Sequence, residues 1–350
     1  TDDNQHASVK DSLTGAEECV GSEGFWNFLT SHSRWSAVFK PATHRLGGIN
    51  LIKRLWCREE TKYLPDKLGV SASDFRKALG FDSVADVANG RRLQSPLADG
   101  GEAAPEYSYF AVVAMDGDEM GRWVCGQKTP QFGSLLADSV REYFENAVPG
   151  ASESLGVRRP LAPSFHLQFS EALANFANEL VPRVLRRFNA QLIYSGGDDL
   201  LFMVRADRAL ECAYAVRSMF RGEDELGLVF RHAESCRYFA DYWPDEVSLT
   251  EDRRGWATVR QPGSGGDRKK ERVYMVPGPQ ADLSCGIAVA HYQHPLQNVV
   301  REAQAAEKRA KQSLSKDGFD RGAFAVSLMK RGGETVHWGG KWSGYALPLY

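Results

Sequence analysis

The sequence has few cysteines, and their spacing fits neither a metal site nor a disulfide framework. The six are Cys19, Cys57, Cys125, Cys212, Cys236 and Cys285. No two of them form a Cys-x-x-Cys pair, the close spacing on which zinc knuckles depend, and scattered cysteines do not indicate a disulfide-stapled fold. This usage favours a reducing compartment, and we expect a cytoplasmic protein. His291 and His294 stand three positions apart without an evident third ligand, so a surface or core role is favoured over a metal site.

Long apolar runs and a strong charge imbalance are also missing. No stretch approaches the roughly 18 apolar residues of a membrane span, so no membrane partner is expected. The net charge is -2, which indicates no general affinity for nucleic acid but is compatible with a local basic patch. The chain begins Thr1-Asp2-Asp3-Asn4, without Met and without a signal-peptide pattern, as a piece of a longer protein would.

The most informative stretch runs from Gln191 to Val204, with the sequence QLIYSGGDDLLFMV. Two apolar runs flank Ser195 to Asp199, a pattern that predicts a β-hairpin with a Gly-Gly turn. Adjacent carboxylates at the tip repel each other, and a divalent cation would remove that repulsion. The glycines would let a phosphate approach the backbone closely. A nucleotide and metal site is therefore one interpretation, and an ordinary solvated turn of Gly and Asp is the other.

A second acidic turn follows a strongly apolar stretch. Residues 109–115, YFAVVAM, predict a buried central strand. The strand leads into Asp116-Gly117-Asp118-Glu119, which again combines carboxylates with glycine. Chemistry is often located where core strands end, because loops there are held by a rigid scaffold. This turn is the second source of carboxylates that a metal site requires.

The composition divides the chain into several parts. We expect a loose N-terminus at 1–20, a helical domain at 21–92, a linker at 93–106, a larger domain at 107–335 and a tail at 336–350. Ser71 to Asp74 predict an N-cap for a helix that begins near Phe75.

An insertion at 222–280 interrupts the larger domain, and its segment 253–272 is rich in Arg and Lys. A mobile, solvated loop is favoured there over a nucleic-acid contact. If this basic loop does contact RNA, neutralising it should weaken binding and lower the salt dependence.

From residue 109 onward the predicted order is strand, helices, hairpin, helix, strand, helix and strand. The helices are expected at 132–147, 165–188, 207–221 and 296–314, and the later strands at 283–290 and 324–329. Pro182 is expected to interrupt or kink the second helix. This order is the split βαβ, ferredoxin-like layout of an α+β fold.

The predicted layout brings the two acidic turns together. Asp116 would face Asp198 and Asp199, and the three carboxylates would hold one or two divalent ions. Mg²⁺ is the natural choice, because it binds through few carboxylates plus substrate phosphates. Lys311, on the helix at 296–314, is placed to bind a triphosphate.

Four motifs then carry a specific resemblance. They are DGDEMG at 116–121, YSGGDDL at 194–200, SCGIAVAHYQHPL at 284–296 and AEKRAK at 306–311. Together they resemble the catalytic palm domain of the large subunit of type III CRISPR effector complexes, closest to the III-B (Cmr) branch. The resemblance covers about residues 105–335, and more weakly the segment LGGINLIKR at 46–54 resembles the helical part that precedes that palm. The layout also resembles nucleotide cyclases and GGDEF diguanylate cyclases.

The resemblance implies a nucleotidyltransferase that uses two Mg²⁺ or Mn²⁺ ions to convert ATP into cyclic oligoadenylates when the complex binds target RNA. It implies other effector subunits, crRNA and target RNA as partners. Asp116, Asp198 and Asp199 match the catalytic and metal-binding carboxylates, and Asp118 matches a further motif carboxylate. The implied nucleotide-binding residues are Gly117, Ser195, Gly196, Gly197, Lys308 and Lys311.

The sequence also departs from the family pattern. It contains no His-Asp dipeptide, so no HD nuclease is assigned, and it lacks a cysteine zinc site. Soon after one palm the chain ends, so a partial or compact form is expected. A diguanylate-cyclase-like enzyme is one alternative, although Asp199 and Leu200 stand where Glu and Phe are usual. A palm that only holds RNA and partner subunits is the other.

Overall fold

The computed structural model describes most of the chain from residue 107 onward and parts of the region before it. The described residues are 9–12, 17–33, 35–36, 38–39, 45–56, 66–67, 69, 71, 80–81, 83–90, 107–223, 246–249, 254–261, 270–312 and 320–344. Two compact units are present, Thr1–Asp82 and Ser83–Tyr350. The helix predicted near Phe75 and the linker predicted at 93–106 lie almost wholly outside the described residues.

The described part of the first unit includes the helices α1 (Glu23–Ser31) and α2 (Gly48–Trp56). The hydroxyl of Ser22 caps α1 by accepting a hydrogen bond from the backbone N–H of Phe25. A small core of Trp26, Leu29, Val38, Phe39 and Leu46 forms there. A third helix, α5 (Val84–Asn89), packs on strands of the second unit, so the division falls before it and not at residue 92.

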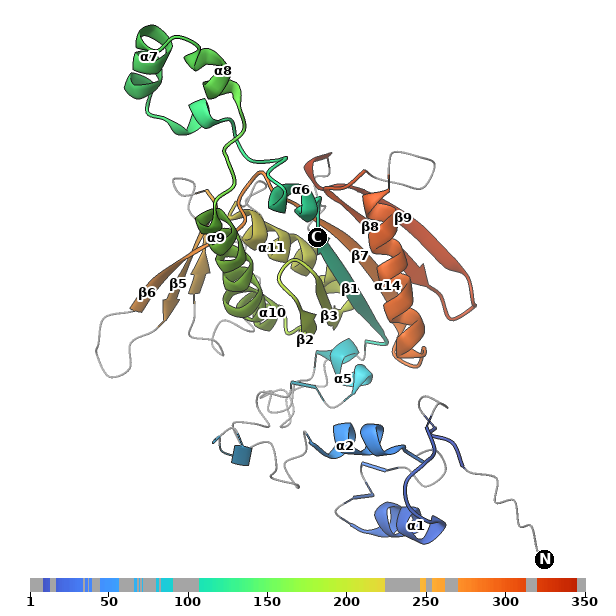
Figure 1. The fold of residues 1–350 in the computed structure, drawn as a ribbon. Coiled ribbons are helices and arrows are strands. Elements are labelled where there is room, and N and C mark those ends of the chain that lie inside the picture. Colours follow the sequence, from blue (N-terminus) through green and yellow to red (C-terminus); the bar gives the residue numbers. More distant parts are fainter. Residues whose placement is uncertain are drawn as a thin grey trace, which may run out of the picture. The chain divides into compact units, whose positions relative to one another are not determined.

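A six-stranded mixed sheet forms the centre of the second unit (Figure 1). Its strands, in spatial order, are β2 (Gln191–Ser195), β3 (Leu200–Arg205), β1 (Tyr109–Gly117), β7 (Leu283–His291), β8 (Ala323–Met329) and β9 (Thr335–Lys341). The first four are antiparallel in the split βαβ order, so the predicted α+β palm-like layout is confirmed. Strand β8 runs parallel to β7.

Strand β9 differs from the expected tail. Residues 335–341 pair with β8 along their whole length, and Trp338 and Trp342 pack on Phe324. The domain therefore continues past residue 335. The aromatic and glycine-rich sequence gives little strand signal by itself, and pairing with β8 supplies what the local pattern lacks.

Helices cover both faces of the sheet. On one face, α9 (Pro163–Ala174), a π-helical segment (η4, Asn175–Leu180), α10 (Val181–Arg187) and α11 (Ala209–Arg221) build the main core with Val113 and Phe202. The π-helical segment lies directly before Pro182, which has no N–H for the regular helical ladder. On the other face lies α14 (Leu296–Lys311), which contacts β7, β8 and β1.

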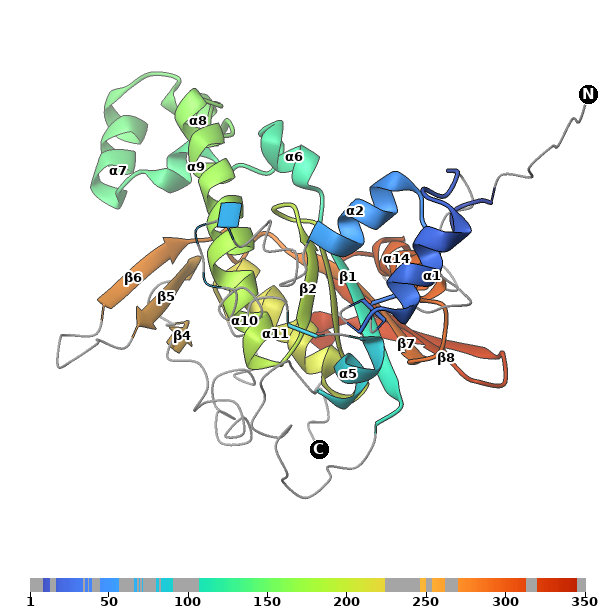
Figure 2. The same ribbon diagram turned by 90° about the horizontal axis from the view of Figure 1, so that it is seen from below.

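A projecting group of short helices connects β1 to α9 (Figures 1 and 2). It comprises α6 (Met120–Val124), a 3-10 turn at Phe132–Leu135, α7 (Asp138–Ala147) and α8 (Ala151–Gly156). Helix α7 has no buried residue, whereas Ala151 and Leu155 of α8 are buried. No described helix is long and apolar enough to cross a membrane.

The insertion contains a second sheet. Strands β4 (Glu246–Ser248), β5 (Trp256–Gln261) and β6 (Lys270–Met275) are antiparallel, and Ala257 and Val259 join the main core. The expectation of a mobile loop at 253–272 is therefore wrong for the two strands, in which Arg260 pairs with Glu271 at 3.1 Å. Residues 262–269 between them lie outside the described part of the chain.

Candidate active site

The ends of β1 and of the β2–β3 hairpin meet at one edge of the sheet. Met115 pairs with Leu200, so Asp116 and Asp199 directly follow and precede a paired position. Gly117 lies against the turn so closely that an added Cβ would stand 2.9 Å from the Cβ and Oδ2 of Asp198. Only glycine permits this approach, and it brings the two acidic turns together as the sequence predicts.

The hairpin turn is held from within and from the helix beside it. The N–H of Gly196 donates to the carbonyl of Asp199 at 2.8 Å. Gly197 adopts φ +107, a backbone conformation that other residues rarely adopt. The hydroxyl of Ser195 donates to the carbonyl of Ala177 in the π-helical segment at 3.3 Å. Ser195 thus fixes one end of the turn to the π-helical segment, and the backbone of Gly197 stays uncovered, whereas the phenol of Tyr194 lies over Gly196.

Lys311 reaches the same edge from the last turn of α14. Its Nζ donates to Oδ2 of Asp116 and to the carbonyl of Gly117 at 3.3 Å. Its other partner is Glu307, whose Oε1 lies 3.2 Å away. Sequence reasoning passed over Glu307, although its place four residues before a lysine on a helix is a recognisable pairing signal.

Gly286 explains how α14 comes so close to the sheet. A Cβ on this residue of β7 would lie 2.1 Å from the carbonyl oxygen of Ala303 and 2.1 Å from the backbone nitrogen of Glu307. The helix face toward the sheet carries small residues, with Ala303, Ala306 and Ala310 all fully buried. Small side chains on both sides therefore let the backbone of α14 lie almost directly on β7. This close packing places Lys311 in contact with Asp116.

The charges around this edge do not balance. Burial raises the pKa of Asp198, and the charges of Asp116 and Asp199 raise it further. Burial and the charge of Asp116 likewise raise the pKa of Asp199. Burial also raises the pKa of Glu307. Among the described residues several carboxylates thus share the ammonium of Lys311, and the edge would gain from an additional cation.

Lys311 itself stays protonated. Burial lowers its pKa, but the hydrogen bond and charge of Asp116, together with Glu307, outweigh this effect and raise it above its ordinary value. As the side chains stand, no three acidic, histidine or cysteine groups in the described residues are close enough to hold an ion together. The ammonium of Lys311 lies against Asp116, where it neutralises a carboxylate of the edge. The donor set, oxygen ligands with excess negative charge, fits a hard divalent cation.

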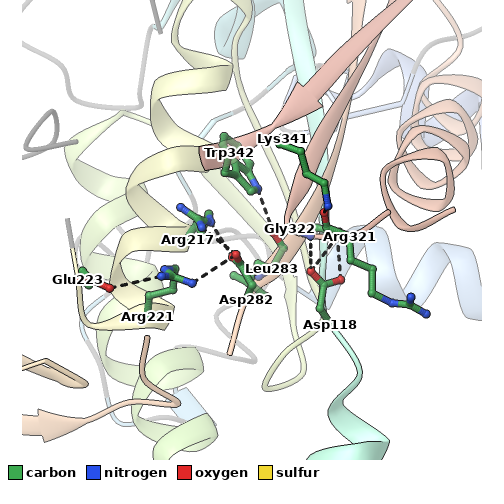
Figure 3. A network of polar contacts seen from close by, with 11 residues as sticks. Asp118, Arg217, Arg221, Glu223, Asp282, Leu283, Arg321, Gly322, Lys341 and Trp342 are labelled. Carbon is green, nitrogen blue, oxygen red and sulfur yellow. Dashed lines mark hydrogen bonds and ion pairs between the residues drawn. The ribbon is translucent and has the colours of Figure 1, made fainter. Parts of the chain in front are cut away.

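Asp118 lies apart from this edge, and so does Lys308. The Asp118 side chain is buried and accepts hydrogen bonds from the Ser284 hydroxyl at 2.8 and 3.0 Å and from the Gly322 N–H at 2.8 Å (Figure 3). Its pKa is raised by burial. Lys308 is exposed on α14, and within the described part of the chain its side chain forms no hydrogen bond or ion pair.

Asp282, next to Asp118, is a residue that sequence reasoning missed. Its two oxygens accept from Arg217 at 2.6 and 2.7 Å, and Arg221 adds a contact at 3.4 Å (Figure 3). Arg217 is buried and its guanidinium lies 5.7 Å from the ring centre of Trp342. An arginine among the buried apolar residues of α11 was the available signal, since such a charge requires a partner.

Comparison with known proteins agrees with this geometry. Residues 109–226 match the family model described as Cas10/Cmr2, second palm domain. Over 226 residues the chain is 28% identical to the CRISPR system Cmr subunit Cmr2 of Pyrococcus furiosus, a match that covers 64% of this chain and 19% of that protein. The chain thus spans about a fifth of that relative.

A solved structure shares the fold. A chain of the type III-B Cmr-beta cryo-EM structure in the apo state superposes with a TM-score of 0.52 at 14% identity. The match covers 87% of this chain and 41% of that one. The resemblance inferred from the motifs is confirmed: residues 109–226 match a Cas10/Cmr2 palm-domain model, and the chain is similar to a Cmr2 subunit and shares the palm fold.

Proposed function

We propose that the palm is a nucleotidyltransferase that converts ATP into cyclic oligoadenylates with two divalent metal ions, Mg²⁺ or Mn²⁺. The observation that carries the proposal is the convergence of Asp116, Asp198 and Asp199 from two separate strand ends, with Lys311 facing them from α14. A structural turn has no use for such an excess of like charge. Two ions held by these carboxylates would activate a 3′-hydroxyl and stabilise the leaving pyrophosphate.

The chain's own residues supply binding and orientation. Lys311 is protonated and partly exposed, so it is able to exchange Asp116 for the oxygens of a triphosphate. That exchange would release Asp116 to bind a cation. Gly197 presents open backbone, which suits contact with a nucleotide, whereas the phenol of Tyr194 lies over Gly196 and would have to turn aside for a nucleotide to reach it. Ser195 keeps this turn in place through Ala177.

We propose further that the chain works within a type III-B effector complex. Its relative is named as a subunit of a Cmr system, which supports other effector subunits, crRNA and target RNA as partners. Synthesis would then begin when target RNA binds. The strand pair β5 and β6 on the insertion carries the exposed charged side chains of Arg260, Glu271 and Arg272, and this part of it remains a candidate for contact with RNA.

Product analysis tests the proposal directly. The chain, alone and assembled with its partner subunits and crRNA, is incubated with labelled ATP or GTP and Mg²⁺ or Mn²⁺, with and without target RNA. Mass spectrometry should find cyclic oligoadenylates from ATP in the presence of target RNA. Product from GTP alone would favour a cyclase-like enzyme instead. If neither nucleotide reacts while RNA binding is intact, the palm is a scaffold.

A further inference from the structure

Asp118 belongs to the same short motif as Asp116, yet its side chain serves a different set of partners. It is only 5% exposed, and its two oxygens accept from two donors: the Ser284 hydroxyl, which is shared between them, and the N–H of Gly322. Its own N–H donates to the carbonyl of Asp282 at 2.9 Å. A buried carboxylate held by two protein donors is fixed in place within the protein.

Gly322, which donates a hydrogen bond to Asp118, is part of a tight turn before β8. Asp320, Arg321 and Gly322 have consecutive φ values of 52, 60 and 49. Such a run of left-handed residues is unfavourable outside glycine and persists only where surrounding contacts hold it. Here Lys341 of β9 donates to the carbonyl of Asp320 at 2.6 Å. It also donates to the carbonyl of Arg321 at 2.8 Å (Figure 3).

The same turn closes the end of α14. The N–H of Arg321 donates to the carbonyl of Ala310 at 2.9 Å, and the N–H of Asp320 donates to that of Gln312 at 2.5 Å. These two acceptors flank Lys311 in the sequence. A continuous series of hydrogen bonds therefore runs from Asp118 through Gly322 and its turn to the backbone on either side of Lys311.

We infer that Asp118 is a positioning residue, which holds the end of α14 so that Lys311 faces Asp116. The inference rests on the proposed function, in which Lys311 binds the triphosphate of ATP. Ser284 supports Asp118 from β7, and Asp118 thus joins the end of β1, the start of β7 and the end of α14. Its effect on the substrate is exerted through Lys311 and not through a metal ion.

Affinity for a non-hydrolysable ATP analogue with Mg²⁺, measured by calorimetry on the full chain, tests this inference. Asp118→Asn should weaken binding by about tenfold, as loss of a supporting partner behind a ligand typically does. Ser284→Ala removes one hydrogen bond to Asp118 and should weaken binding by about fivefold. In a Lys311→Ala background, neither substitution should weaken binding further, because the residue through which both act is gone.

Several outcomes would overturn the inference. If the loss of analogue affinity from Asp118→Asn or Ser284→Ala adds fully to the loss from Lys311→Ala, Asp118 does not act through the lysine. A lower melting temperature with unchanged affinity would leave Asp118 a purely structural residue. Loss of one bound Mn²⁺ in Asp118→Asn, counted by electron paramagnetic resonance, would make it a metal ligand.

The test also separates this inference from the proposed function. If the unaltered chain binds no analogue, the proposed function fails, and this inference fails with it. If the unaltered chain binds the analogue but the variants do not couple to Lys311, only the inference fails. Should Asp118→Asn not fold, Ser284→Ala and its combination with Lys311→Ala measure the same coupling.

Discussion

Two groups of carboxylates lie close together at the end of β1 and differ in how their charge is met. The edge cluster, Asp116, Asp198 and Asp199, has the ammonium of Lys311 as its cationic partner in the described part of the chain. The clamp, buried Asp118 and partly buried Asp282, is met by hydrogen-bond donors and two arginines. The edge cluster is left short of positive charge, as a site for cationic or phosphate-bearing ligands would be. The clamp has its partners built in, as a structural element would.

Two carboxylates that lie two positions apart in one motif can therefore have different roles. Asp116 ends a strand at an open edge, whereas Asp118 follows the strand and turns into the protein. The motif alone shows two equivalent carboxylates. What distinguishes them is the set of donors that the fold brings to each one.

The largest expected effect comes from the edge cluster. Replacing Asp198 and Asp199 together by Asn should reduce nucleotide transfer by about a thousandfold or more, because the charge that would hold the cations is lost. Product formation from labelled ATP measures this effect. The matched control is Asp207→Asn, which lies after β3 in an exposed ion pair with Arg205 and should leave the rate unchanged. A double variant that retains its activity would exclude this cluster from catalysis.

Substitutions in the clamp should lower the free energy of unfolding. Asp282→Ala leaves the buried guanidinium of Arg217 without its bidentate partner and should lower the free energy of unfolding by about 3 kcal/mol. Asp207→Ala removes an equally short bidentate pair at the surface and should cost less than about 1 kcal/mol. Denaturant titrations of both variants give the comparison. Equal losses would show that the clamp is no more important than a surface pair.

Gly286→Ala should displace α14, the helix that connects the clamp to Lys311 at the edge cluster. The added methyl would overlap the backbone of α14, so the helix must move away from β7, at a cost of about 1–3 kcal/mol in stability. Because Lys311 lies on this helix, nucleotide affinity should fall as well. Gly332→Ala, where nothing lies within 4 Å, is the control and should change neither quantity. Retained affinity in Gly286→Ala would mean that the seating of α14 does not determine where Lys311 lies.

The smallest effect is a difference in pH dependence. The pKa of Asp198 is raised, so its ionised form destabilises the fold as pH rises above the ordinary value of 3.8. Asp198→Asn should therefore be slightly more stable than the unaltered chain at about pH 7 and equal to it at about pH 3. Chemical denaturation at the two pH values measures this.

Glu119 is the control, because its effect on stability should change with pH in the opposite direction. Hydrogen bonds from Lys128 and Arg122 lower its pKa to about 2, so its contribution is present above the ordinary value of 4.5 and is lost as pH falls toward 2. Glu119→Gln should then be slightly less stable at about pH 7 and equal at about pH 2. A pH profile of the same sign for both variants would contradict the assigned causes.

Local patterns were sufficient to predict much of the fold. Continuous apolar runs identified β1 and β7, and helical spacing identified α11 and α14, because each of these elements buries its own periodic face. The hairpin and its relation to Asp116 followed from the order of these elements. Lys311 was placed correctly because it ends a helix that the layout directs to the same edge.

Contacts between distant positions were not predictable in this way. The hydrogen bond from Gly322 to Asp118 joins residues 204 apart, and no periodicity reports such a partner. Strand β9 depends on pairing with β8 and not on its own residues. The charged stretch in β5 and β6 suggested a loop, since a pair of strands with exposed Arg and Glu side chains has a composition similar to that of a solvated loop.

The sheet of β4, β5 and β6 has a consequence for how this chain can change over evolution. It interrupts the palm as an added segment would, but Ala257, Val259 and Val276 now belong to the main core. Tyr274 also donates to Glu179, and Asn175 donates to the carbonyl of Met275, so the π-helical segment beside the hairpin depends on this sheet. Deletion would expose apolar surface and remove these bonds. This insertion therefore cannot be removed without rebuilding the helix layer that supports the hairpin.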